Sequence, residues 1–156
     1  MNGPILGLTA LSAKHRKFAH DHQLMVSTTT ARVARDVANA AGKPPAGGPK
    51  SRTGRLFKGT KWNIKVFPLK VIAKVYNRVP YAFYMEYGTR PHVISARRKR
   101  FLAFDWPKMD AYPYFAKSVN HPGTKPYLFL FGEVARGGVE LRQRLNRNAK
   151  ALASKF

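Results

Sequence analysis

A repeat of apolar and small residues over residues 8–41 restricts the fold of this chain more than any other feature. Its members follow one another in steps of three and four, which places them on one face of a helix. A helix of this length measures roughly 50 Å and has to pack against its own domain or a neighbouring subunit. The weak helix formers Ser27 to Thr30 predict a break near Thr28. The repeat runs through Leu8, Leu11, His15, Phe18, His22, Met25, Thr29, Val33, Val37 and Ala40.

After residue 60 the pattern changes to the alternation of strands. It predicts strands at 62–67, 71–76, 91–96 and 101–106, and a further extended segment at 112–120. A basic amphipathic helix is expected at about 132–153. The order predicts an α+β fold with a long N-terminal helix, an antiparallel sheet of four to five strands, and a C-terminal helix packed on the sheet. In that helix Val134, Leu141, Leu145 and Leu152 are expected to face the body, and Arg142, Arg144, Arg147 and Lys150 to face outward.

The length of 156 residues and the hydrophobic share of 44% predict one domain over 1–156. A glycine- and proline-rich segment, 42–54, is expected to be a flexible loop or arm. It is not a phosphate-binding P-loop, because Gly48 and Pro49 stand where that motif requires Lys and then Ser or Thr. Its prolines also lack the N–H groups that cradle a phosphate.

The chain is strongly basic, with 29 Lys and Arg against seven Asp and Glu and a formal charge of +22. Residues 61–100 hold ten bases and a single acid, Glu86. Such a charge favours contact with nucleic acid, anionic lipid or an acidic protein. The densest cluster is either a solvated loop or a phosphate contact, and its residues are the DNA-facing candidates Arg97, Arg98, Lys99 and Arg100.

Catalysis and membrane insertion are not supported by the sequence. The seven carboxylates are scattered among bases, and there is no cysteine. The five histidines, His15, His20, His22, His92 and His121, lack the spacing of a metal triad. No apolar run approaches the ~20 residues that span a bilayer, and the first residues lack the charge of a signal peptide. We therefore expect no enzyme, no cofactor, no metal site, no membrane contact and no secretion.

The segment 79–92 is the most informative one. Tyr81, Tyr84 and Gly88 have helical spacing, Pro80 can begin a helix, and Gly88 can end it in the left-handed conformation. Strand alternation fits almost as well. A second compact segment, 121–126, predicts a rigid turn.

Glu86 has two interpretations. It is either in a surface ion pair or a buried anchor that accepts hydrogen bonds from Thr89, His92 or a nearby arginine.

These segments together resemble the gene-product-ten-like minor tail component family, the neck or tail-completion proteins of siphophages. The resemblance covers about residues 10–150 and depends on the order of the motifs. It comprises Thr-Gly-x-Leu, Tyr-Ala-x-Tyr-x-Glu-aromatic-Gly-Thr, a linking histidine, Leu-x-Phe at 102–104, and His-Pro-Gly-Thr-x-Pro. The residues that it marks for structure or assembly are Thr53, Gly54, Tyr81, Tyr84, Glu86, Tyr87, Gly88, Thr89, His92, His121, Pro122, Gly123, Thr124 and Pro126.

The resemblance implies a virion structural protein of the phage head–tail junction, assembled in the host cytoplasm. It implies a homo-oligomeric ring, sixfold or twelvefold, between the connector or stopper and the tail terminator or tail tube. Genomic DNA passes through the channel of such a ring without sequence-specific contact. The alternatives are a tail terminator ring and, from the charge alone, a basic nucleic-acid-binding module.

Overall fold

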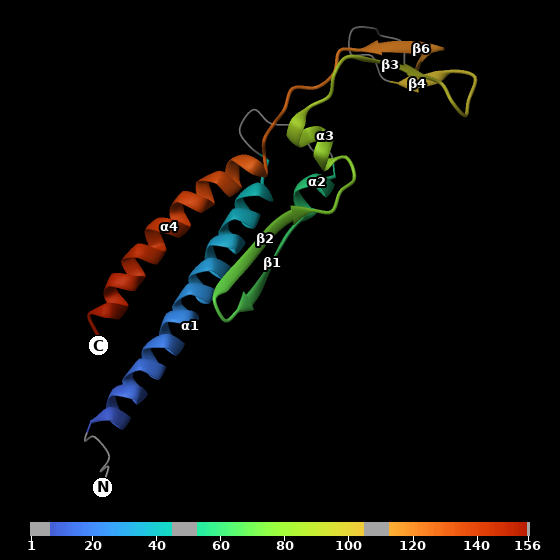
Figure 1. The fold of residues 1–156 in the computed structure, drawn as a ribbon. Coiled ribbons are helices and arrows are strands. Elements are labelled where there is room, and N and C mark those ends of the chain that lie inside the picture. Colours follow the sequence, from blue (N-terminus) through green and yellow to red (C-terminus); the bar gives the residue numbers. More distant parts are fainter. Residues whose placement is uncertain (1–6, 45–52, 105–112, 156) are drawn as a thin grey trace. The chain divides into compact units, whose positions relative to one another are not determined.

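The computed structural model describes residues 7–44, 53–104 and 113–155, which form two compact units (Figure 1). The first unit contains Met1–Pro80 and Phe129–Phe156, and the second contains Tyr81–Leu128. Residues 45–52 of the expected arm lie outside the described residues, as do Asp105, Trp106 and Tyr112 at the ends of expected strands.

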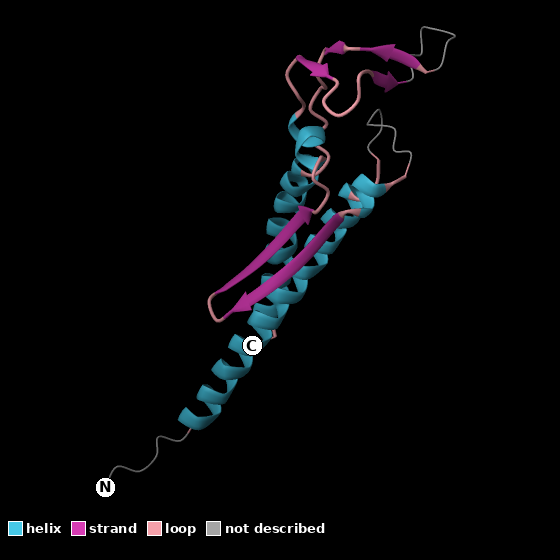
Figure 2. Ribbon diagram, turned by 90° about the vertical axis from the view of Figure 1, so that its right-hand side faces the viewer, coloured by secondary structure: helices cyan, strands magenta, loops and turns pink. Residues whose placement is uncertain are grey.

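The described residues of the first unit form two long helices, a one-turn helix and a β-hairpin. Helix α1 (Leu8–Ala41) packs against α4 (Phe131–Ala153) and against the antiparallel strands β1 (Thr60–Phe67) and β2 (Lys70–Asn77). Figure 2 shows the hairpin lying along the helices. A single turn, α2 (Arg55–Lys58), leads into β1. The core of this unit contains Val33, Ala34, Val37, Leu56, Phe57 and Phe129.

Helix α1 is continuous, so the predicted break near Thr28 is wrong. The Thr28 hydroxyl donates to the Leu24 carbonyl at 2.7 Å, and its side chain thus bonds within the helix. Thr29 and Thr30 are buried, and the Thr29 hydroxyl accepts a hydrogen bond of 3.0 Å from the Asn148 amide of α4. Burial against α4 thus overrides the low helix propensity of the threonines.

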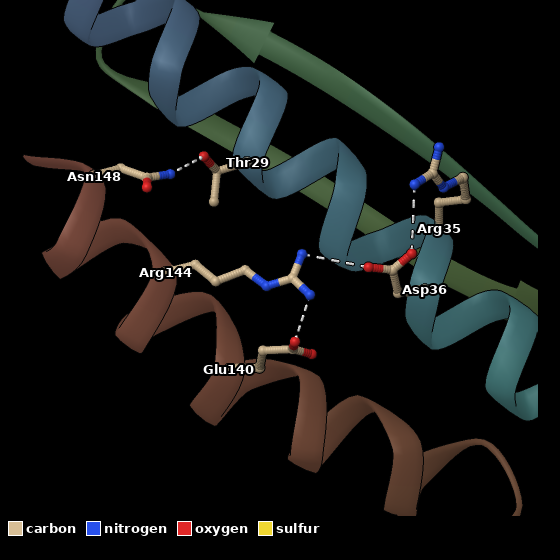
Figure 3. Close-up of polar contacts among 6 residues, drawn as sticks. All are labelled: Thr29, Arg35, Asp36, Glu140, Arg144 and Asn148. Carbon is tan, nitrogen blue, oxygen red and sulfur yellow. Dashed lines mark hydrogen bonds and ion pairs between the residues drawn. The ribbon is translucent and has the colours of Figure 1, made fainter.

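The helix pair is held by close packing and by a network of ion pairs around a partly buried arginine. Gly137 of α4 lies against Val37 of α1, where a side chain would collide. Arg144 lies between two carboxylates, 3.4 Å from Asp36 and 2.6 Å from Glu140 (Figure 3). Its side chain is only 27% exposed, which corrects the expectation that Arg144 faces outward.

The described residues of the second unit form one short helix and two short strand pairs. Helix α3 (Ala82–Tyr87) precedes β3 (His92–Ser95) and β4 (Leu102–Phe104), and β5 (Tyr114–Ala116) and β6 (Ser118–His121) follow. Strand β3 pairs with β6 and β4 with β5, all antiparallel.

The α+β class with a long N-terminal and a C-terminal helix is confirmed, but the sheet is smaller than the four to five strands predicted. The described residues form three two-stranded sheets. Strands β1 and β2 are joined by the two-residue turn Pro68-Leu69 and pair locally, whereas the remaining strands belong to the other unit. Within the described residues, no helix has the length and apolar character needed to span a membrane.

The contact between Gly137 and Val37 predicts opposite effects for two adjacent glycines. A Cβ at Gly137 would lie 2.2 Å from Cγ2 of Val37, a short β-branched side chain that cannot swing away, whereas a Cβ at Gly138 would meet nothing within 4 Å. Gly137→Ala should therefore destabilise the protein by about 1–3 kcal/mol. Gly138→Ala should stabilise it by up to about 1 kcal/mol through helix propensity. Urea unfolding followed by far-ultraviolet circular dichroism measures both, and equal stability of the two variants would contradict this packing.

Candidate functional site

The two motif segments of the second unit meet in a clasp, which we define as Gly88, Thr89, Gly123 and Thr124. The Thr89 N–H donates to the Thr124 carbonyl at 3.0 Å, and the Thr124 N–H donates to the Thr89 carbonyl at 3.1 Å. The two hydroxyl oxygens lie 3.1 Å apart, and the Thr89 hydroxyl also accepts from the Thr124 N–H at 3.0 Å. Residues 35 positions apart in the chain are thus joined by backbone and side chain together.

Each glycine of the clasp leaves room for the backbone opposite. A Cβ at Gly88 would lie 2.4 Å from the Thr124 carbonyl oxygen, and a Cβ at Gly123 would lie 2.2 Å from that of Thr89. Both glycines also have positive φ, +75° and +84°. Gly88 ends α3 as predicted, with an extended ψ of −179° in place of the left-handed helical value. Only glycine satisfies both the space and the dihedral angles here.

The chain after Pro126 is fastened to the end of α3. The Tyr127 N–H donates to the Met85 carbonyl at 3.0 Å, and the Leu128 N–H donates to the Glu86 carbonyl at 3.2 Å. The side chain of Glu86 is buried, with the residue 6% exposed, which favours the anchor interpretation over a surface ion pair. The clasp and these two bonds hold α3 from its C-terminal end.

The two motif histidines extend the clasp into the β3–β6 pair. His92 and His121 are cross-strand partners, with ring centroids 5.1 Å apart. The His121 Nδ1 accepts from the Gly123 N–H at 3.0 Å, so this nitrogen carries no proton. The His92 Nδ1 lies 2.8 Å from the Arg90 carbonyl, to which it donates. Both rings therefore stabilise turns, and the described residues hold no group of three or more side chains able to bind a metal.

Helix α3 presents an exposed aromatic surface, which we define as Phe83, Tyr84 and Tyr87. Phe83 is 64% exposed, and the other two are more than half exposed. The Phe83 ring centroid lies 5.9 Å from that of Tyr84 and 4.9 Å from that of Tyr87. Phe83 thus contacts both tyrosines, and the three rings form an apolar patch of the kind that marks protein–protein interfaces.

The basic loop 97–100 connects β3 to β4, opposite the connection between β5 and β6. Ser95 pairs with Ser118 and Leu102 with Ala116. Between these two pairs one side of the chain has six residues, 96–101, and the other side has only Lys117. The Ala96 N–H donates to the Lys117 carbonyl at 3.1 Å and closes the base of the loop. Its four basic residues, Arg97, Arg98, Lys99 and Arg100, are all exposed.

Thr53 and Gly54 belong to the first unit and have a local role there. Gly54 has a φ of +67° and precedes α2, and the Thr53 hydroxyl accepts from the Arg55 N–H at 3.3 Å. They are not part of the clasp.

Sequence reasoning missed a second basic surface, on the hairpin of the first unit. Its bases are dispersed in the chain and come onto one face only through the strand register. The four lysines concerned are Lys61, Lys65, Lys70 and Lys74.

Comparison of the chain with protein-family models, with curated proteins and with solved structures finds no match. What the motifs imply about function is therefore a proposal.

The clasp predicts a strong effect of a single methyl group. Gly123→Ala should destabilise the second unit by about 1–3 kcal/mol, because the new Cβ meets the Thr89 carbonyl and the residue keeps a positive φ. The control is Gly132→Ala in α4, where a Cβ meets nothing within 4 Å. Thermal unfolding followed by the near-ultraviolet circular dichroism of the tyrosines measures both. A Gly123→Ala protein as stable as the control would show that the two turns do not lie together.

Proposed function

We propose that this chain is a virion structural protein of the phage head–tail junction. It acts as the subunit of a ring that joins the connector to the tail tube around the DNA channel. The observation that carries the proposal is the exposed aromatic surface of α3, held in place by a clasp made of the motif residues.

The clasp supports the proposal because it gives the motifs a joint physical role. The residues that resemble the family lie far apart in the sequence, at 81–92 and 121–126. In the fold Gly88-Thr89 and Gly123-Thr124 are hydrogen-bonded partners, and Tyr127 is bonded to the end of α3. Motif residues that form one structural element support the resemblance to the family more strongly than the same residues scattered over a surface would.

The incomplete burial of the large apolar side chains also supports a subunit that assembles with others. In the described part of the chain no large side chain is fully buried, and Leu8, Leu11 and Leu24 of α1 are more than half exposed. In a ring, one surface of a subunit meets a different surface of its neighbour, and the rotation closes. The aromatic surface of α3 supplies the apolar centre of such an interface, and the aromatic rings bring large contact area at low entropic cost.

The basic loop 97–100 fits contact with passing DNA. Four exposed bases on an extruded loop neutralise phosphates without sensing the base sequence. A few such contacts per subunit leave the genome free to move, since the affinity depends steeply on the number of phosphates contacted.

The free nucleic-acid-binding module is the second candidate, and the charge of +22 favours it. The two candidates differ in assembly. A module binds duplex as a monomer or small oligomer, whereas a neck protein forms closed rings and is found in finished particles. A tail terminator ring would share the assembly behaviour, and its position in the particle distinguishes it.

The ring proposal predicts that the aromatic surface is needed for assembly. Replacing Phe83, Tyr84 and Tyr87 together by Ser should reduce the ring to single subunits, because the apolar centre of the interface is lost. The control is Leu69→Ser at the hairpin turn, where the residue is 99% exposed. Mass photometry of the purified proteins gives the assembly size, and circular dichroism verifies the fold. Rings of unchanged size from the triple variant would contradict this role of α3.

A further inference from the structure

The β1–β2 hairpin carries a line of positive charge that its register creates. On the face that holds Lys61, the paired positions are Lys61 with Tyr76, Asn63 with Lys74, Lys65 with Ile72, and Phe67 with Lys70. Each of these pairs contributes one lysine, and the lysines alternate between the two strands. Successive pairs on one face of an antiparallel hairpin lie two residues apart, so the charges repeat about every 6.7 Å.

A fifth base continues the line beyond the strands. The Arg78 N–H donates to the Gly59 carbonyl at 3.2 Å, which extends the pairing past Thr60 and Asn77. The Arg78 guanidinium lies over the Tyr76 ring, 5.6 Å from its centroid, and is therefore on the same face. We call this set the lysine ladder; it consists of Arg78, Lys61, Lys74, Lys65 and Lys70, in order along the hairpin, over about 27 Å.

The ladder faces solvent, and the opposite face of the hairpin contacts the helices. All five bases are exposed, whereas Ile64, Ala73 and Val75 on the opposite face are partly buried. Both strands contact α1. Figure 1 shows the hairpin beside α1, on the side away from α4. The bases are thus presented on a supported surface.

No described carboxylate of the first unit forms an ion pair with the ladder. In the described part of the first unit the acids are Asp21, Asp36, Glu133 and Glu140, and each pairs with a histidine or arginine of α1 or α4. Among the described residues, none of the ion pairs includes a ladder base. Among the described residues of this unit, the bases therefore have no acidic partner along the hairpin.

The arrangement limits the self-repulsion of the ladder. Like charges directly opposite each other destabilise a strand pair. Here every lysine is opposite a neutral residue, so the nearest bases are diagonal neighbours. The hairpin therefore carries a line of positive charge with little electrostatic repulsion between its strands. The spacing of this line matches a linear anion with a regular repeat.

We propose that the lysine ladder binds the phosphate backbone of duplex DNA without recognising its sequence. One strand of a duplex carries a phosphate every ~3.4 Å along the axis, so one ladder step equals two phosphates and the ladder spans roughly eight base pairs. Single strands bind to open aromatic platforms. On this face a cation already lies over each ring and competes with a stacked base, Lys70 at 5.3 Å from the Phe67 centroid and Arg78 at 5.6 Å from that of Tyr76. The ladder lies in the first unit and is distinct from the loop 97–100, and the inference holds for a free module as well as for a neck ring.

The test compares two fourfold variants of equal charge. The ladder variant replaces Lys61, Lys65, Lys70 and Lys74 by Gln. The control variant replaces four exposed lysines away from the hairpin by Gln: Lys14 and Lys17 of α1, Lys150 of α4, and Lys155, which follows α4. Both lose four positive charges, and neither removes a side chain from the described ion pairs.

Fluorescence anisotropy with a labelled duplex of about 30 base pairs measures the dependence of affinity on salt. Five phosphate contacts contribute about −4.5 to the slope of log K against log salt, which is a loss of roughly 500-fold between 50 and 200 mM. The ladder variant should reduce the magnitude of this slope by about 3.6. The control should reduce it by less than 1, and circular dichroism should show both variants folded.

Four results would overturn the proposal. Equal losses in the two variants would mean that binding follows net charge alone. Displacement of duplex by poly-glutamate at equal charge concentration would assign the ladder to an acidic protein. Tighter binding of a single strand than of duplex would assign it to unpaired nucleic acid, and absence of duplex binding at 50 mM salt would remove it as a site. Each of these outcomes leaves the ring proposal standing, because assembly size is measured independently.

Discussion

The second unit depends on the close approach of two backbone segments at Gly88 and Gly123. Each carbonyl oxygen of Thr89 and Thr124 occupies the position where the opposite glycine would otherwise carry a side chain. The N–H and carbonyl groups of both threonines are hydrogen-bonded to each other, and the threonine hydroxyls add a third contact. The strands described between residues 81 and 128 are three or four residues long, so their pairing alone is weak. The clasp adds a further connection between the two ends of this segment.

The first unit depends on a comparable close approach between helices. Gly137 allows α4 to lie against Val37, and this contact brings Arg144 between Asp36 and Glu140. Asp36 is thereby paired across the two helices, whereas Asp21, Glu133 and Glu140 pair with residues of their own helix. The hairpin on the other side of α1 receives none of them, which leaves its lysines free to attract an anion.

The sequence predicted the helices and strands better than the contacts between them. The helical repeat of 8–41 and the alternation at 62–76 gave α1 and the hairpin, because periodicity is a local property. Gly88 and Gly123 were identified within motifs, but their contact was not, because nothing local specifies which segments meet. The break at Thr28 was wrong since its hydroxyl bonds within the helix and its neighbours are buried by α4. The lysine ladder was missed because it exists only after the register has brought two strands together.

The Gly-Thr clasp fixes α3 and, with it, the aromatic surface of the second unit. Amide hydrogen exchange in the intact protein tests this claim most directly, because each clasp bond protects an identified N–H. The N–H groups of Thr89, Thr124, Tyr127 and Leu128 should exchange together and more slowly than any in the loop 97–100. Exchange of the Thr89 and Thr124 amides as fast as that of the loop would contradict the account.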